Sequence, residues 1–212
     1  MGGGYFRAEG GSFVKTKLCW LIAGLLALAL TSCGVFFAPL EGRWNPNDDK
    51  FGDGYVEKTL YPTLDGYVIL PSGSDFGTNP IMQLAGDKRA LLKFDSSAIP
   101  KDIFHAELRL YSDSLISPPN SFQVKLILQD WDASVTYVQA TNLGFLALLT
   151  SPSVSVSIPG YYSWDVTTLV RSVSPSSMKG LLVDYLSGMG PIANFRSTDN
   201  VANRPYLAIW AR

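Results

Sequence analysis

The chain has 212 residues, of which 47% are hydrophobic and 17% charged, and its net charge is −1. So small a charge gives no electrostatic reason to expect nucleic acid as a partner. With two cysteines and a single histidine, His105, the chain also lacks the side chains for a zinc site or for a Cys–His or two-histidine catalytic centre.

The N-terminal segment has the features of an export signal. Lys15 and Lys17 precede the uncharged run LCWLIAGLLALAL at residues 18–30. As a helix this run covers about 20 Å at ~1.5 Å per residue, less than the ~30 Å hydrocarbon core of a bilayer. A basic segment followed by a short apolar one is typical of a signal peptide. We predict a signal peptide over residues 1–32, with translation starting at the first residue or at Val14.

The apolar run leads into Leu-Thr-Ser-Cys at residues 30–33. This order resembles the bacterial lipobox, in which a leucine and two small residues precede an invariant cysteine. The resemblance implies cleavage before Cys33 and attachment of diacylglycerol to its thiol. Two or more acyl chains make a far more durable membrane anchor than one. An uncleaved membrane anchor and ordinary secretion, with Cys33 as a bystander, are the alternatives.

Lipidation at Cys33 predicts a protein of the cell envelope that is attached to the membrane through that lipid. Position 34 is Gly rather than Asp, which in enteric-type bacteria favours the outer membrane. We therefore expect the outer membrane or cell surface rather than the cytoplasmic membrane. Loss of residues 1–32 removes three basic side chains and one acidic side chain, so the net charge becomes about −3. Because Cys19 leaves with the signal peptide, no disulfide is expected.

Residues 33–63 are rich in Gly, Pro, Asn and Asp, a composition that predicts a flexible linker. Three of its aspartates suggest calcium: Asp48, Asp49 and Asp53. The spacing does not fit an EF-hand loop, because Lys50 stands where Gly is needed and Val56 where Glu is needed. Structural calcium therefore has no clear motif, and we predict no cofactor and no metal site.

From residue 65 onward, apolar and polar residues alternate with a period of two. The pattern occurs at residues 89–94, 106–111, 124–129, 154–158, 181–185 and 207–209. Strict alternation predicts strands that are buried on one face only. Gly, Pro, Ser and Asn fill the gaps as turn residues. We predict an all-β fold over residues 64–212, an antiparallel jelly-roll-like β-sandwich.

Two segments are exceptions with helical character. In WDVTTLVRSV, Asp165 can cap a helical turn that buries Leu169, Val170 and Val173, and Pro175 prevents its extension. The apolar segment NLGFLALLTS at residues 142–151 is a second candidate for a short turn or helix.

A set of motifs follows in order along residues 65–212: DGYV at 65–68, DFG at 75–77, RALLKFDSSAIP at 89–100, AELRLY at 106–111, Trp131, WDVT at 164–167, GLLV at 180–183, FRS at 195–197 and RPYL at 204–207. This order resembles the DNRLRE domain family. Its members are secreted β-sandwich modules with jelly-roll topology, and the family overlaps a carbohydrate-binding module family that recognises alginate-type polysaccharides.

The chain departs from the family pattern in two places. Residues 135–137 are Val-Thr-Tyr where Thr-Trp-Asn is usual, and residues 197–199 are Ser-Thr-Asp where the pattern is Ser-Arg-Glu. Several motif residues also have a structural role: Phe94, Trp131 and Trp164 suit core packing, and Asp95 suits a turn.

The resemblance implies a non-catalytic module that binds polysaccharide, with an alginate-like or other uronate-containing glycan as the expected ligand. Such modules stack sugar rings on exposed aromatic side chains. The aromatic candidates are Tyr137, Tyr161 and Tyr162 in the domain, with Trp44 and Tyr61 in the linker. A uronate also requires cations, for which Arg89, Lys93 and Arg196 are the family-matched candidates.

Two other functions remain open from the sequence. One is a structural or adhesive surface lipoprotein that binds a protein partner. The other is an enzyme, which we do not predict. His105 lies in a predicted strand, no G-x-S-x-G motif occurs, and the aspartates and glutamates form no recognisable acid/base pair.

Overall fold

The computed structural model describes residues 54–71, 73–76, 79–142 and 149–212. The predicted signal peptide, Cys33, Trp44 and most of the predicted linker lie outside these residues, as does most of the second helical candidate. Within the described residues, no helix has the length and apolar character needed to cross a bilayer.

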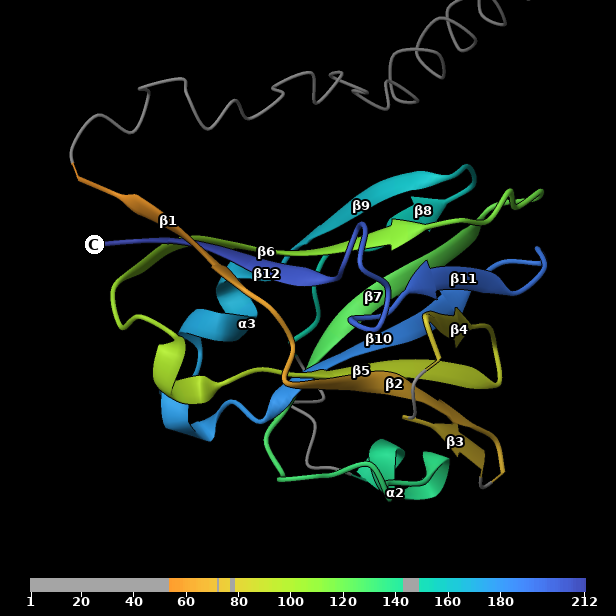
Figure 1. Cartoon of the computed structure of the whole chain (residues 1–212), viewed down its shortest axis with the longest axis horizontal. Coiled ribbons are helices and arrows are strands. Elements are labelled where there is room, and N and C mark those ends of the chain that lie inside the picture. Colours follow the sequence, from red (N-terminus) through yellow and green to blue (C-terminus); the bar gives the residue numbers. More distant parts are fainter. Residues whose placement is uncertain (1–53, 72, 77–78, 143–148) are drawn as a thin grey trace, which may run out of the picture. The chain divides into compact units, whose positions relative to one another are not determined.

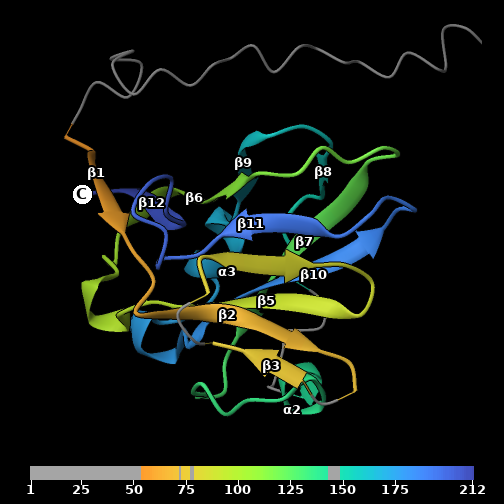
Figure 2. The same ribbon diagram turned by 45° about the vertical axis from the view of Figure 1, so that its right-hand side comes forward.

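Two six-stranded sheets form the fold, and every strand pair is antiparallel. Sheet A has the order β1 (Val56–Leu60), β12 (Tyr206–Ala211), β6 (Ile103–Ser112), β11 (Ala193–Arg196) and β4 (Ile81–Leu84), and β9 (Gly160–Asp165) also pairs with β6. Sheet B has the order β3 (Gly73–Asp75), β2 (Leu64–Ile69), β5 (Lys88–Lys93), β10 (Gly180–Ser187), β7 (Asn120–Ile127) and β8 (Val154–Val156). The chain crosses between the sheets at most connections, so the predicted all-β sandwich is confirmed (Figures 1 and 2).

The main core lies between the two sheets. In β6 the inward residues Ala106, Leu108 and Leu110 are fully buried, as the alternation predicts. Trp164 is also fully buried, and its indole Nε1 donates to the carbonyl oxygen of Phe122 at 3.1 Å. Each of the two leucines contributes about 1.5–3 kcal/mol by leaving water.

The central strands of sheet B, β2, β5 and β10, are buried on both faces, so the prediction of burial on one face only is wrong there. Strand β7 keeps the predicted alternation over most of its length. In β5 the consecutive residues Ala90, Leu91 and Leu92 are all fully buried. Residues 129–142, which include helix α2 (Tyr137–Asn142), lie over the outer face of sheet B (Figure 1). The side chains of this second cluster are Val68, Leu91, Ile127, Trp131, Val135, Ala140 and Leu182.

The domain begins before residue 64, so the predicted linker is too long. Strand β1 pairs with β12 in a register from Val56 opposite Ala211 to Leu60 opposite Leu207. Four of the five β1 residues are exposed, because β1 is an edge strand with little buried surface. An exposed strand has no apolar alternation, which is why the sequence pattern does not reveal it.

The helical turn after β9 agrees with the sequence prediction in place, but its N-cap residue is Val166, without a side-chain cap hydrogen bond, and Val173 lies beyond the helix and is only partly buried. Helix α3 spans Thr167–Arg171 and buries Leu169 and Val170. The carboxylate of Asp165 accepts a hydrogen bond from the backbone N–H of Thr167 at 2.9 Å. Two 3₁₀ turns, Ser96–Ala98 and Pro175–Ser177, complete the helical elements among the described residues. Asp95 caps the first of them, as expected for a turn residue.

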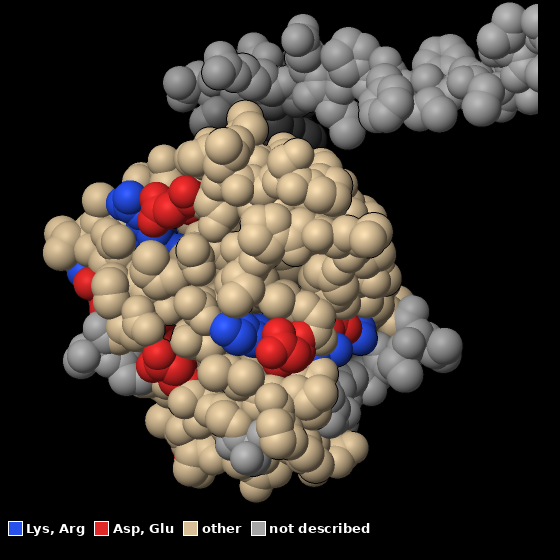
Figure 3. Space-filling view, turned by 90° about the vertical axis from the view of Figure 1, so that its right-hand side faces the viewer, with Lys and Arg blue, Asp and Glu red and all other residues tan. Residues whose placement is uncertain are grey.

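The two ends of the sandwich differ in character. The start of β1 and the end of β12 lie together at one end (Figure 1). The opposite end is formed by the loops at residues 113–119, 157–159 and 188–192, and Figure 3 shows it with few charged side chains. Its exposed apolar residues include Leu115 and Met189, which are 75% and 91% exposed.

Candidate functional site

Four tyrosines lie in a row on the outer face of sheet A. β6 directs Tyr111 outward, and its neighbour β9 places Tyr161 directly opposite. On the other side of β6, β12 places Tyr206 opposite Arg109. Tyr61 follows β1 and extends the row. We call Tyr61, Tyr111, Tyr161 and Tyr206, together with Arg109 and Arg196, the tyrosine face.

The four rings are in contact with one another. Tyr111 and Tyr161 meet edge to face with their ring centroids 5.1 Å apart. Tyr161 and Tyr206 are 6.1 Å apart, and Tyr206 and Tyr61 are 6.4 Å apart. Tyr161 is 49% exposed and Tyr61 is 55% exposed. The row therefore presents two accessible rings that are supported by two half-buried ones, a geometry suited to stacking on flat apolar surfaces.

Two arginines border the row, and each is held by a carboxylate. The guanidinium of Arg109 lies 5.7 Å from the ring centroid of Tyr206 and donates to Glu107 at 2.8 Å. The guanidinium of Arg196 lies 4.9 Å from the ring of Tyr111 and makes a two-pronged ion pair with Asp113. These pairs fix the planes of the guanidinium groups beside the rings.

Glu107 is the centre of a polar network at the end of the row. Burial acts to raise its pKa, but hydrogen bonds from His105, Ser163 and Arg109 outweigh burial and lower the pKa to about 2. Glu107 is therefore ionised at neutral pH and has no proton to donate. His105 contacts it at 3.0 Å and stacks on Trp210. The network organises the face and does not have the form of an acid/base pair.

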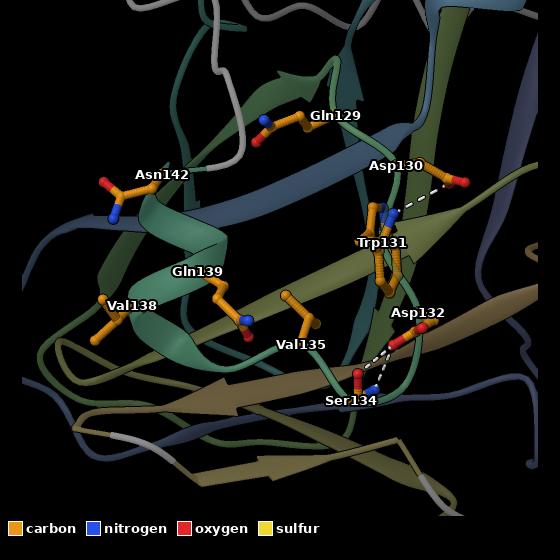
Figure 4. A pocket seen from close by; sticks show the side chains of 9 residues that line it. All are labelled: Gln129, Asp130, Trp131, Asp132, Ser134, Val135, Val138, Gln139 and Asn142. Atoms are coloured by element: carbon orange, nitrogen blue, oxygen red, sulfur yellow. Dashed lines mark hydrogen bonds between the residues drawn. The ribbon is translucent and has the colours of Figure 1, made fainter.

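On the sheet B side, a pocket of about 580 Å³ lies between α2 and the preceding loop (Figure 4). Its carboxylates are already engaged: Asp130 accepts from Lys93, and Asp132 accepts from Ser134. Trp131 is only 5% exposed, and its indole Nε1 donates to the carbonyl of Lys179 at 3.0 Å. The two acidic side chains disfavour an anionic ligand, and Trp131 offers little ring surface for stacking.

Among the six predicted ligand residues, two belong to the tyrosine face: Tyr161 and Arg196. Three others lie on the sheet B side and hold residues 129–142 in place. Arg89 pairs with Asp184 at 2.6 Å and donates to the hydroxyl of Tyr137. Lys93 donates to Asp130 and to the carbonyl of Trp131. No one surface includes all six predicted residues.

Tyr162, the sixth, points to the opposite side of β9 from Tyr161 and packs partly against the main core. Its hydroxyl accepts from the backbone N–H groups of Ser157 and Ile158 and donates to the carbonyl of Ile158. Its polar group is therefore used to hold the turn before β9. Ligand contact by these six residues stays a prediction.

Sequence reasoning missed three residues of the face: Arg109, Tyr111 and Tyr206. The alternation in AELRLY placed Arg109 and Tyr111 on the outward side of a strand, which was the available signal. What the pattern does not contain is the pairing that places β9 and β12 beside β6 and so gathers tyrosines from distant parts of the chain.

Residues 56–211 match carbohydrate-binding module family 96. The chain belongs to this family. The match runs from the first residue of β1 to the last residue of β12, so the family 96 module comprises both sheets. Modules of this kind bind carbohydrate and are not catalytic. No curated protein resembles the chain closely enough to count as a relative.

In the described part of the chain, no group of three or more His, Cys, Asp or Glu side chains is placed to hold a metal ion. The possibility of structural calcium stays untested.

Proposed function

We propose that the family 96 module holds a uronate-containing polysaccharide on the tyrosine face. The observation that carries this proposal is the row of four contacting tyrosine rings, two of them exposed, bordered by two arginines. Sugar rings present flat apolar C–H surfaces that stack on such rings, while polar side chains fix their orientation. An alginate-like chain fits because its repeated rings can follow a linear row.

The arginines support an acidic ligand. Arg196 and Asp113 form a surface pair with side chains that are 23% and 33% exposed. Exposed ion pairs contribute only about 0–1 kcal/mol, so a sugar carboxylate can replace Asp113 at little cost. The planar guanidinium group matches a carboxylate through two parallel hydrogen bonds.

We further propose that lipid on Cys33 anchors the protein in the cell envelope, at the outer membrane or cell surface. The support is the lipobox-like sequence, which lies outside the described residues. The variant Cys33→Ser should lose labelling by a radiolabelled fatty acid. Labelling that persists in this variant contradicts the anchor.

The test of the tyrosine face uses the full chain in detergent and a panel of alginate, pectin and a neutral glucan, with and without calcium. Tyr161→Ala should weaken binding of the acidic polysaccharide by about tenfold, because it removes the most central exposed ring. Tyr161→Phe keeps the ring and is the matched control, with nearly unchanged affinity. Equal binding by Tyr161→Ala and the unaltered chain rejects the face as the site.

A protein partner is the second candidate function, and the apolar end of the sandwich favours it. Leu115, Ile158 and Met189 are exposed in the loops of that end. Exposed apolar patches of this kind mark interaction surfaces. Met189→Asp should remove specific crosslinks to envelope proteins in whole cells while polysaccharide binding is retained. Crosslinks that do not change exclude this end.

A further inference from the structure

A second pocket, of about 470 Å³, lies at the other end of sheet A, where the module's chain enters and leaves. Its lining comes from four places in the sequence: Tyr55 before β1, residues 101–104 at the start of β6, Arg171 at the end of α3 and Arg212 after β12. The register joins these segments, because Ala211 lies opposite both Val56 and Ile103. The pocket is therefore built on paired strands.

The pocket has an excess of positive charge. Three cationic side chains line it, Lys101, Arg171 and Arg212, against one acidic side chain, Asp102. Within the described residues, none of the three cations takes part in an ion pair, whereas Arg89, Lys93, Arg109, Lys125 and Arg196 all do. Uncompensated charge around a hollow focuses the field and attracts anions.

Aromatic rings form one wall of the same pocket. Tyr55 packs on Phe104 with a centroid separation of 4.8 Å, and the guanidinium of Arg212 lies 4.6 Å from the ring of Tyr55. Phe104 keeps 39% of its surface exposed. A small inorganic anion has no apolar surface to pack against these rings, whereas a sugar ring has one.

We propose that this pocket binds one carboxylate-bearing sugar residue, with its carboxylate among Lys101, Arg171 and Arg212 and its ring against Tyr55 and Phe104. The saccharide part of the proposal rests on the proposed function, and the anion part rests on the three cations. The site is separate from the tyrosine face. Tyr111 lies seven positions after Phe104 in β6, about 23 Å at ~3.3 Å per residue, so one acidic chain can engage both places.

The test measures binding of trigalacturonate and of its methyl ester to the full chain in detergent by titration calorimetry. Tyr161→Ala is the common background, since it removes the central ring of the tyrosine face. Arg171→Gln should weaken trigalacturonate binding by about tenfold, and adding Lys101→Gln should bring it below detection. Lys179→Gln, which lies outside both places, is the matched control for the loss of one positive charge.

Asp102→Asn provides a change in the opposite direction. Removal of the one acidic side chain in the pocket should raise the affinity for trigalacturonate by up to about threefold. Damage to the fold does not increase affinity, so this gain separates an electrostatic effect from a structural one. The methyl ester should bind at least tenfold more weakly than the acid.

Three results overturn the proposal. Unchanged affinity for trigalacturonate in both Arg171→Gln and Asp102→Asn shows that the ligand does not bind in this pocket. Equal affinity for the acid and its methyl ester removes the role of the carboxylate. If inorganic phosphate binds as tightly as trigalacturonate, the pocket is a general anion site and does not recognise the sugar ring. A tyrosine face that binds no polysaccharide contradicts the proposed function alone, because these titrations already lack Tyr161.

Discussion

The two sheets of the sandwich use their outer faces in opposite ways. Sheet A leaves Glu107, Arg109 and Tyr111 half-buried on its outer face. The equivalent face of sheet B carries Leu91 and Leu182, which are buried beneath residues 129–142. Both sheets are antiparallel and have six strands, so the difference comes from the covering segment and not from the strands themselves.

The two outer faces of this small sandwich have separate roles, one in stability and the other in binding. The segment that covers sheet B, residues 129–142, adds a second apolar cluster to the core, and burial of this cluster contributes to the free energy of folding. The tyrosines of sheet A gain less from burial and remain available to a ligand. We therefore expect substitutions on sheet B to change stability and those on sheet A to change binding.

The largest effect is expected from Trp131→Ala on the sheet B side. Trp131 is 5% exposed and packs on Phe76 with a centroid separation of 5.7 Å. Loss of a buried tryptophan leaves a cavity and typically costs about 3–5 kcal/mol. Urea unfolding of the full chain should show this loss, while Trp131→Phe should lose less than half as much. A change below about 1 kcal/mol means that the cover contributes little.

The next effect tests the ion pairs beneath that cover. Asp184 is 6% exposed and receives Arg89 and Lys125, each at 2.6 Å. Asp184→Ala leaves two half-buried cations without their carboxylate, and we expect a loss of about 3 kcal/mol in denaturant unfolding. The matched change on sheet A is Asp113→Ala. The side chain of Asp113 is 33% exposed, against 8% for that of Asp184, so the expected loss is below about 1 kcal/mol. Similar losses in the two variants contradict the contrast between the sheets.

Much of the fold follows from the sequence, because local alternation reports the side of a strand that faces the core. The inward set of Ala106, Leu108 and Leu110 was predicted and is fully buried. The same rule misjudged β5, since Leu91 is buried by residues that lie some forty positions further along the chain. No local pattern reports a covering segment of that kind.

The candidate site was predicted only in part for a related reason. Tyr161 and Tyr162 are adjacent in a strand, so their side chains point to opposite faces, and only Tyr161 joins the row. Thr198, which stands where the family pattern has Arg, has a structural role in this chain. Thr198 donates from its hydroxyl and its backbone N–H to the buried carboxylate of Asp65.

An intermediate effect with a defined pH dependence is expected from Glu107→Gln. Because the pKa of Glu107 is lowered from 4.5 to about 2 in the folded chain, its carboxylate stabilises the fold above pH 4.5. That contribution disappears as the pH falls through about 2. At pH 7 the variant should lose of order 2 kcal/mol, a value reduced for partial exposure.

The measurement for Glu107 is the difference in unfolding free energy between the unaltered chain and Glu107→Gln as a function of pH. The difference should be constant between pH 7 and 5 and should narrow between pH 4.5 and 2. A difference that stays constant down to pH 2 means that the network around Glu107 does not hold its ionised form.

The smallest change in stability is expected from Tyr61→Ala, a substitution on the tyrosine face of sheet A. Tyr61 is 55% exposed, and its ring packs on that of Tyr206 at the end of the row. Surface substitutions usually stay within about 0.5 kcal/mol, so the urea midpoint should barely move. Binding of the acidic polysaccharide should nevertheless weaken about threefold to tenfold, because one of two accessible rings is lost. An unchanged affinity would confine the binding surface to Tyr161 and its arginine neighbour, whereas a large loss of stability would show that β1 depends on this ring for its place in sheet A.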